Sequence, residues 1–380
     1  MEITAKKIII VAGEASGDMH AANLVSAIKK INPRIEFFGL GGKRMEQEGV
    51  ALLFNLADLA VVGFVEVLKN LKKIRQAFSL ILKKAEEIKP DAAILVDYPG
   101  FNLRLAKALK KRNIKVIYYI SPQIWAWGLR RVKLIKKVVD KMIVVFKFEE
   151  ELYKKFGIDA LFAGHPFLDM INPTISRDNF LKSNGLSADK LTIGLMPGSR
   201  ERETETHLPI MLESAKLIYK DIPNSQFMVI KSPSVSQDIF DKLLNRYSMP
   251  LKRIENVSYD SINACDFVLV ASGSATLEAA ILLKPMVIIY KVSFLTWVFL
   301  KFMLKIPYVG LVNVVAGRKI VPECLQFGAT PKRISEETNR ILSDQIELSR
   351  IKIDLSKVRE KLGEKGASNR AAKEIVDIIS

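Results

Sequence analysis

The sequence predicts an α/β protein made of two doubly wound, Rossmann-like domains that face each other across a cleft. Short apolar runs typical of buried strands recur along the chain, and segments with helical spacing separate them. The pattern pauses once, around residues 164–174, where two prolines indicate a connection between domains, and then restarts. A length of 380 residues, with 49% hydrophobic residues, is ample for two cores of ordinary size.

In the first half, five runs are expected to be strands of one parallel sheet, because each is apolar throughout rather than alternating. These runs are residues 7–12, 35–40, 91–96, 115–120 and 142–146. Between the first two, residues 13–18 are expected to form a turn and residues 20–30 a helix.

The second half repeats the pattern, with expected strands at 192–196, 226–230, 267–271 and 286–290. We therefore expect one domain at residues 1–168 and the other at residues 169–358. Residues 359–380 carry a final amphipathic helix near 368–379. This helix is expected to pack either back on the first domain or on a partner chain, and a homodimer is compatible with the sequence.

The composition is basic, with 58 Lys and Arg against 41 Asp and Glu and a formal net charge of +17. Such a surplus favours a polyanionic partner, namely nucleic acid, acidic lipid headgroups or phosphorylated substrates. A lysine-rich surface that serves solubility alone is the alternative. Because the basic residues are spread along the chain with no known nucleic-acid module, we expect no nucleic acid partner.

Cysteine and histidine usage indicates a reducing compartment and no metal site. Cys265 and Cys324 lie in apolar segments with no disulfide or metal-ligand spacing, and the three histidines are scattered. The first residues enter a strand-like run without room for a signal peptide. No run reaches the ~18 apolar residues of a transmembrane helix. These features predict a cytoplasmic protein without a metal or cofactor.

Ligands of open parallel sheets bind beyond the carboxyl ends of the strands, so the residues after each strand are candidates. After the first strand comes a loop of small and acidic residues that is expected to approach a ligand: Glu14, Ser16, Gly17 and Asp18. The alternative is a tight turn in which Ser16 or Asp18 caps the next helix. The loop lacks the G-x-G-x-x-G spacing of nicotinamide-dependent oxidoreductases, which argues against that class.

Asp97 directly follows the apolar run 92–96. A carboxylate at this position is partly desolvated, which raises its pKa and suits it to accept a proton. The alternative is that Asp97 only orders the turn through backbone amides.

Two loops of the second half resemble a nucleotide site. The first is Gly198, Ser199 and Arg200, where amides at a helix start and a guanidinium favour a pyrophosphate; an N-cap beside an exposed arginine is the alternative. The second is Ser272, Gly273, Ser274 and Thr276, followed by Glu278, which could bind both ribose hydroxyls. A capping box at Glu278 is its alternative. No D-x-D triplet occurs, so we expect a diphosphate to leave without a metal, stabilised by Arg200 and helix dipoles.

In this order, these segments resemble the lipid-A-disaccharide synthases, a family with the glycosyltransferase B fold. The resemblance spans nearly the whole chain through segments 11–18, 65–68, 96–102, 120–127, 163–166, 196–200, 271–278 and 308–313. It implies an inverting transfer of 2,3-diacylglucosamine from UDP-diacylglucosamine to the 6-hydroxyl of diacylglucosamine 1-phosphate. The products would be lipid A disaccharide 1-phosphate and UDP.

The resemblance also implies roles for residues. Asp97 matches the candidate catalytic base, and Arg200 matches an arginine needed for activity. Asn313 matches the nucleotide-binding side, together with Glu278 and the 272–276 loop. The first domain would then bind the acceptor and the second the UDP-sugar. Many members have a second aspartate at the position of Gly100, and its absence here favours Asp97 as the base.

Acylated substrates require contact with a bilayer, which we expect at the cytoplasmic face of the inner membrane, with anionic lipid. Residues 59–76 have the composition of an interfacial helix. The expected contacts are Val61, Val62, Phe64, Leu68, Leu71 and Lys72. A core-facing helix with a solvated lysine face is the alternative. Residues 294–306 are a second candidate, with burial between the domains as its alternative.

Two questions stay open at the sequence level. A non-hydrolysing UDP-sugar epimerase would share the two-domain architecture and the ribose-binding half, and it would need no apolar, basic surface. Trp125 and Trp127 could line the acceptor side or pack beneath the cleft.

Overall fold

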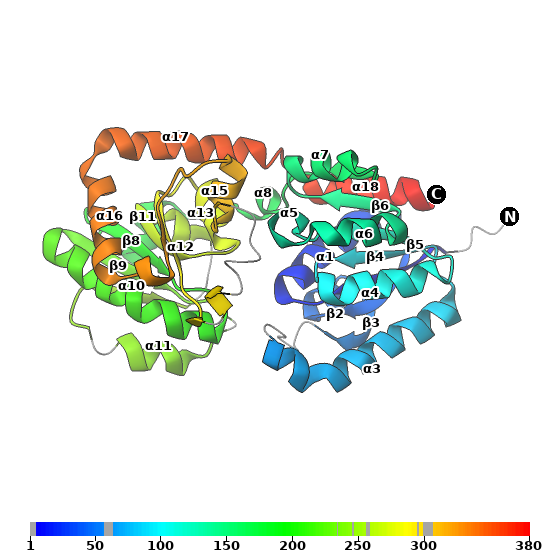
Figure 1. Cartoon of the computed structure of the whole chain (residues 1–380). Coiled ribbons are helices and arrows are strands. Elements are labelled where there is room, and N and C mark those ends of the chain that lie inside the picture. Colours follow the sequence, from blue (N-terminus) through cyan, green and yellow to red (C-terminus); the bar gives the residue numbers. More distant parts are fainter. Residues whose placement is uncertain are drawn as a thin grey trace. The chain divides into compact units, whose positions relative to one another are not determined.

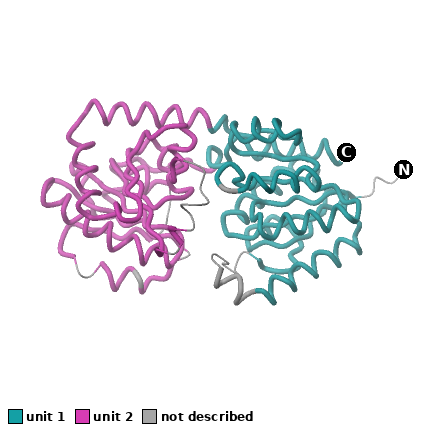
Figure 2. The backbone as a smooth tube through the Cα atoms, viewed as in Figure 1, with its two compact units in different colours: residues 1–169, 362–380 teal, residues 170–361 magenta. Residues whose placement is uncertain are grey.

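The computed structural model describes residues 5–56, 64–233, 235–244, 247–255, 259–294, 296–298 and 307–380, without the side chains of 64–70, 127 and 239. The chain forms two compact units (Figure 2). Unit 1 comprises Met1–Asp169 and Leu362–Ser380, and unit 2 comprises Met170–Lys361.

Unit 1 is built on a seven-stranded parallel sheet in the order β3-β2-β1-β4-β5-β6-β7 (Figure 1). Its strands are β1 (Lys7–Ala12), β2 (Glu36–Gly41), β3 (Val50–Asn55), β4 (Ala92–Val96), β5 (Lys115–Tyr119), β6 (Lys141–Val144) and β7 (Ala160–Phe162). The chain builds outward in one direction to β3 and then returns to add β4 on the other side of β1. The carboxyl ends of β1 and β4 are therefore the switch point of this sheet, where ligands of such folds bind.

Helices cover both faces of this sheet, which explains why its central strands are apolar throughout. The described helices of unit 1 are α1 (Ala15–Ile31), α2 (Lys43–Gln47), α3 (Phe64–Ile88), α4 (Pro99–Lys110), α5 (Ile124–Trp127), η2 (Leu129–Arg131), α6 (Val132–Val138), α7 (Lys147–Lys155) and α18 (Ala367–Ile379). Ile9 and Val11 lie in a core with α3, α4 and α6, whereas Ile8 and Ile10 lie in a core with α1 and α18.

The closing helix α18 packs on α1 within unit 1, although nearly two hundred residues of unit 2 precede it. Ile375 and Ile379 belong to the same buried core as Ile8. Arg370 fixes the start of α18 by donating from Nε to the Ala163 carbonyl at 2.8 Å.

Unit 2 has a six-stranded parallel sheet in the order β10-β9-β8-β11-β12-β13. Its strands are β8 (Leu191–Met196), β9 (Ser225–Ile230), β10 (Leu251–Ile254), β11 (Phe267–Ala271), β12 (Met286–Tyr290) and β13 (Glu323–Leu325). Its described helices are α9 (Arg177–Ser183), α10 (Glu201–Asp221), α11 (Gln237–Leu244), α12 (Tyr259–Asn263), α13 (Ala275–Ile281), α15 (Leu311–Ala316), η3 (Gln326–Gly328), α16 (Pro331–Ser343) and α17 (Gln345–Lys361), while α8 (Phe167–Met170) lies at the unit boundary. Its switch point lies between β8 and β11.

The predicted α/β class with two doubly wound sheets is confirmed, and every predicted strand is present within two residues of its expected ends. The sequence analysis missed β3, β7, β10 and β13, which are the edge strands of the two sheets. Three of these strands have short or broken apolar runs: β7 and β13 are three residues long, and β10 reads Leu-Lys-Arg-Ile. β3 carries a continuous apolar run at residues 50–54, which the sequence analysis overlooked. Within the described residues, no helix is both long and apolar enough to span a bilayer.

Candidate active site

The candidate site of unit 1 lies at the switch point between β1 and β4. These strands pair in parallel with Ala12 beside Val96, so Glu14 and Asp97 leave the same edge of the sheet. Asp97 and Tyr98 both adopt the left-handed conformation, with φ of 45° and 46°. Such strain persists only where the surroundings impose it. Here the Asp97 carbonyl accepts hydrogen bonds from Asn102 Nδ2 at 2.8 Å and from the Tyr118 hydroxyl at 2.5 Å.

The surroundings of Asp97 in unit 1 raise its pKa and so make it a suitable base. Burial raises the pKa of Asp97 to about 7, and the nearby Glu14 carboxylate adds to the rise. A hydrogen bond from the Tyr98 backbone opposes both effects. A carboxyl group that titrates near neutral pH can accept a proton and still be ionised in a useful fraction.

Gly13 is required by a close approach of the Tyr98 ring. A Cβ at Gly13 would lie 2.1 Å from Tyr98 Cδ1, which no side chain can occupy. The ring also stacks on Phe101 with centroids 5.9 Å apart. Tyr98 thereby forms a rigid wall beside Asp97, which the sequence analysis did not anticipate.

The prediction for the loop after β1 needs correction. The helix α1 begins at Ala15, so Ser16, Gly17 and Asp18 lie in its first turn and not in a loop before it. Neither Ser16 nor Asp18 caps α1, whose N-cap is Glu14 without a side-chain cap bond. The buried Asp18 carboxylate instead accepts from three backbone amides at 2.7 to 3.2 Å, those of Gly42, Arg44 and Met45. Asp18 therefore holds the turn between β2 and α2.

In unit 2, the first candidate loop follows β8. Gly198 has φ of 126°, a conformation that other residues rarely adopt. Arg200 is the N-cap residue of α10, and its half-exposed side chain forms an ion pair with Glu203 at 2.8 Å. The other Glu203 oxygen accepts from the Ser199 amide at 3.3 Å. The loop thus presents a guanidinium and the positive end of a 21-residue helix at one place.

His207 is a positioning residue of this loop that the sequence analysis missed. Its ring lies buried on α10, with Nδ1 3.2 Å from the Pro197 carbonyl and Nε2 accepting from the Lys291 amide at 3.0 Å. A carbonyl at Nδ1 and an amide at Nε2 require the neutral Nδ1–H tautomer, and burial lowers the pKa of His207 accordingly. His207 therefore ties the end of β8 to the end of β12.

In the loop after β11, one residue borders free space and two residues hold the loop in place through hydrogen bonds. Gly273 has φ of 150°, and a Cβ there would meet nothing within 4 Å. The buried Thr276 hydroxyl donates to the Gly273 carbonyl at 2.8 Å, and the Ser272 hydroxyl donates to the Val309 carbonyl at 3.1 Å. Ser274 is exposed at the N-cap position. Ser272 and Thr276 thus shape the loop, and Gly273 and Ser274 form its accessible surface.

Glu278, on α13, is the candidate ligand-binding carboxylate of unit 2. It is partly buried, and burial raises its pKa to about 7. Within the described part of the chain, its side chain forms neither a hydrogen bond nor an ion pair. The capping-box alternative is wrong, because the N-cap Ser274 and Glu278 exchange no side-chain cap bond. A desolvated carboxylate without a protein partner is typical of a ligand-binding group.

Asn313 was predicted to bind a nucleotide, and its side chain is engaged within the protein. The side chain is fully buried and saturated. Its Nδ2 donates to the Val321 carbonyl and to Glu323 Oε1, and its Oδ1 accepts from two backbone amides, those of Ile320 and Val321. Glu323 in turn accepts from the amides of Val309 and Gly310 at 3.0 Å. Asn313 and Glu323 therefore fix the segment that also receives Ser272.

Most of the predicted membrane segment lies outside the described residues. Val61 and Val62 are not described, and the side chains of Phe64 and Leu68 are not described either. On α3, Leu71 is half-buried and Lys72 is exposed. Of the second candidate, 295 and 299–306 lie outside the described residues, and Phe294 is 61% exposed.

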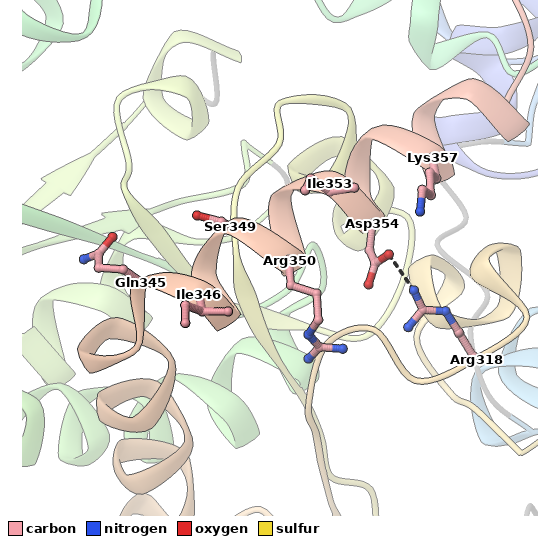
Figure 3. A pocket seen from close by; sticks show the side chains of 8 residues that line it. All are labelled: Arg318, Gln345, Ile346, Ser349, Arg350, Ile353, Asp354 and Lys357. Carbon is pink, nitrogen blue, oxygen red and sulfur yellow. Dashed lines mark hydrogen bonds and ion pairs between the residues drawn. The ribbon is translucent and has the colours of Figure 1, made fainter.

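Unit 2 also carries an open hollow of about 740 Å³ along α17, which contains none of the predicted site residues (Figure 3). Arg318 and Asp354 form an ion pair on its wall. The remaining lining residues are Gln345, Ile346, Ser349, Arg350, Ile353 and Lys357. Within unit 2, none of these residues lies in the loops that follow β8 and β11.

Comparison with known proteins decides the family. A family model described as lipid-A-disaccharide synthetase matches residues 8–379. The chain belongs to this family. A lipid-A-disaccharide synthase of Syntrophus aciditrophicus is 42% identical over 371 residues, which cover 97% of each chain. The resemblance inferred from the ordered synthase motifs is therefore confirmed.

Solved structures show that the synthase family shares its fold with other enzymes. The glycotransferase of kitacinnamycin matches with a TM-score of 0.68 at 13% identity, over 98% of this chain and 99% of that one. A UDP-GlcNAc 2-epimerase from Neisseria meningitidis, bound to UDP-GlcNAc, matches with a TM-score of 0.61 at 15% identity, over 98% of both chains. The glycosyltransferase B type of fold is confirmed, and the fold alone does not separate a synthase from an epimerase.

The raised pKa of Glu278 predicts a pH-dependent effect on stability. The folded protein keeps a proton on Glu278 up to about pH 7, whereas the unfolded chain loses it above its ordinary value of 4.5. Wild type therefore loses stability as the pH rises through this window. Glu278→Gln removes the titrating group. We therefore expect its free energy of unfolding to exceed that of wild type by about 1–3 kcal/mol near pH 8, and to differ little from it near pH 4.

Urea unfolding of the unit 2 transition at both pH values measures this effect. Glu360→Gln, at an exposed position of α17, is the control and should show no pH-dependent difference. An equal difference between Glu278→Gln and wild type at both pH values would contradict the assignment.

Proposed function

We propose that the chain transfers 2,3-diacylglucosamine from UDP-diacylglucosamine to the 6-hydroxyl of diacylglucosamine 1-phosphate, which yields lipid A disaccharide 1-phosphate and UDP. Membership of the synthase family supports a UDP-sugar transfer in lipid A biosynthesis. The observation that carries the chemistry is Asp97, a carboxyl group with a pKa of about 7 on a strained turn at the unit 1 switch point.

In this proposal unit 1 binds the acceptor. The 6-hydroxyl must lose its proton as it attacks the anomeric carbon, and Asp97 accepts that proton. Attack on the face opposite the departing UDP inverts the anomeric centre in a single displacement. Glu14 lies near enough to Asp97 to raise its pKa, and Tyr98 limits the room beside it.

Unit 2 binds the donor. Negative charge develops on the diphosphate as the sugar leaves, and Arg200 at the start of α10 is placed to stabilise it. The Glu278 carboxylate accepts hydrogen bonds from the two ribose hydroxyls. These bonds offset the cost of removing the carboxylate from water. Ser199, Gly198 and the 272–276 loop contribute backbone amides, while His207 and Asn313 keep the two loops in position.

A UDP-sugar epimerase is the competing function, because such an enzyme shares the fold. A structural match at 15% identity does not indicate a shared activity, whereas 42% sequence identity over nearly the whole chain favours the synthase. The two activities differ in their need for an acceptor, so the products formed with and without one separate them.

We further propose that the enzyme works at the cytoplasmic face of the inner membrane. Both proposed substrates carry acyl chains, and the chain has a net charge of +17 that favours anionic headgroups. The start of α3 and the residues before it combine apolar and basic side chains, and the exposed Lys72 and Lys73 continue this segment. No membrane-spanning segment is needed for such interfacial contact.

The transfer assay is the first test. With the diacyl UDP-sugar and the diacylglucosamine 1-phosphate, we expect the purified chain to form UDP and the disaccharide, with and without a chelator. Asp97→Asn should bind UDP as wild type does and lose about 10²- to 10⁴-fold in turnover, because only the proton acceptor is removed.

UDP binding measured by calorimetry is the control, because unchanged binding shows that this variant is folded. Wild-type turnover by Asp97→Asn would exclude Asp97 as the base. An epimerised UDP-sugar formed without an acceptor would favour the epimerase instead.

The pH dependence tests the environment of the base. Because the ionised carboxylate is the active form, kcat/KM should rise with pH and level off above a midpoint near 7. Glu14→Gln removes a negative charge that raises the Asp97 pKa, so its midpoint should move to lower pH. The midpoint should stay above the ordinary value of 3.8, because burial is the larger cause. Glu36→Gln, at the exposed start of β2, serves as control, and an unshifted midpoint in Glu14→Gln would refute the coupling.

Vesicle flotation tests the membrane contact. Wild type should float with vesicles that contain phosphatidylglycerol at low salt and dissociate at high salt. The double variant Lys72→Glu with Lys73→Glu should lose about tenfold or more in partitioning, since each basic residue adds ~1 kcal/mol. Lys352→Glu on α17 of unit 2 is the matched control. Absence of salt-sensitive binding by wild type would rule the contact out.

A further inference from the structure

One segment next to the proposed base has no role in the function described so far. Residues 120–127 follow β5, the strand beside β4, and pairing of Val96 with Tyr119 places both strand ends at the same edge. The Asp97 amide donates to the Tyr119 carbonyl at 3.0 Å. The segment therefore begins one residue after a direct backbone contact with the proposed base.

A single helix, α7, holds this segment through three side chains. Trp125 Nε1 donates to Glu149 Oε1 at 2.9 Å. The Trp125 ring meets the Phe148 ring edge-on, with centroids 5.5 Å apart. One turn further along, the Tyr153 hydroxyl donates to the Pro122 carbonyl at 3.1 Å. These contacts leave Gln123 exposed and Trp125 half-buried on the same segment.

Glu149 is an unusual anchor for this purpose. Its side chain is 1% exposed, and its Oε2 forms no hydrogen bond of ordinary geometry among the described residues. Burial raises its pKa to about 7, although Trp125, Ser121 and the nearby backbone amides of Phe146 and Val145 oppose the rise. A buried carboxyl group with an unsatisfied oxygen destabilises a fold, whereas an apolar residue would not. The position is therefore poorly explained by stability alone.

Glu150, the next residue on the same helix, differs from Glu149 because its carboxylate is stabilised by ion pairs. Glu150 forms ion pairs with Lys147 and Lys154 and accepts from the Phe162 amide. These contacts lower its pKa to about 2. Among the described residues, Glu150 forms no hydrogen bond or ion pair with the 120–127 segment, whereas Glu149 has its indole partner there.

We propose that Glu149 is a positioning residue for the acceptor: by orienting Trp125 it fixes the 120–127 segment beside Asp97, and this segment contacts the acceptor sugar. The inference rests on the proposed function, since it assigns an acceptor to unit 1. It predicts that loss of Glu149 weakens acceptor binding and leaves donor binding in unit 2 unchanged.

The experiment measures KM for each substrate separately in five variants. Glu149→Ala and Trp125→Phe should each raise the acceptor KM by about tenfold, with the donor KM within about twofold of wild type. The double variant should be no worse than either single one, because both remove the same contact. Glu149→Gln should restore a near-wild-type acceptor KM, since its amide oxygen also accepts from the indole. Glu150→Ala should leave the acceptor KM unchanged.

Hydrogen exchange separates failure of this inference from failure of the proposed function. Amides of residues 124–128 should exchange faster in Glu149→Ala than in wild type, and this readout needs no turnover. Faster exchange without transferase activity in wild type would remove the proposed function and leave the positioning intact. Equal rises of both KM values, or an acceptor KM in Glu150→Ala that matches Glu149→Ala, would overturn the inference. If Glu149→Ala does not fold, Trp125→Phe and Glu149→Gln still decide it.

Discussion

Burial of parallel strands on both faces is the constraint on which the whole arrangement depends. Ile8 to Val11 alternate between two cores, so none of them can be polar. The central strands therefore leave little room for polar groups that a ligand could reach, and such groups gather beyond the strand ends, where the first turns of helices offer unpaired amides. Asp97 after β4, Arg200 after β8 and Glu278 after β11 are the outcome of that restriction.

The same burial tunes the chemistry of these groups. Asp97, Glu149 and Glu278 lie at the margins of their cores, and burial is the largest cause that raises the pKa of each to about 7. None of the three has a cationic partner among the described ion pairs. Each therefore destabilises the fold when ionised, which is the expected mark of groups kept for binding or catalysis.

A second layer of buried residues keeps the loops in place through hydrogen bonds to the backbone. His207 ties two strand ends of unit 2, and Glu323 with Asn313 fixes the segment that receives Ser272. In unit 1, Asp18 holds the turn after β2. These side chains are fully buried or nearly so, because a group that orders backbone amides must exclude water from them.

The sequence by itself determined the two doubly wound sheets, the central strands and the family, because continuous apolar runs and ordered motifs are local properties. It also pointed to Asp97, Arg200 and Glu278 as candidates, since each lies in the turn or the first helical turn after a central strand. Tertiary structure decided which polar side chains are already engaged: Asp18 and Asn313 resemble ligand-binding residues in sequence, yet backbone amides of other segments saturate them. The anchor Glu149 was missed because its partner Trp125 lies on another segment of the chain. Three of the four edge strands were missed because their apolar runs are short or broken. Which polar groups keep a vacant hydrogen-bonding position is settled only when the chain brings all of its amides together.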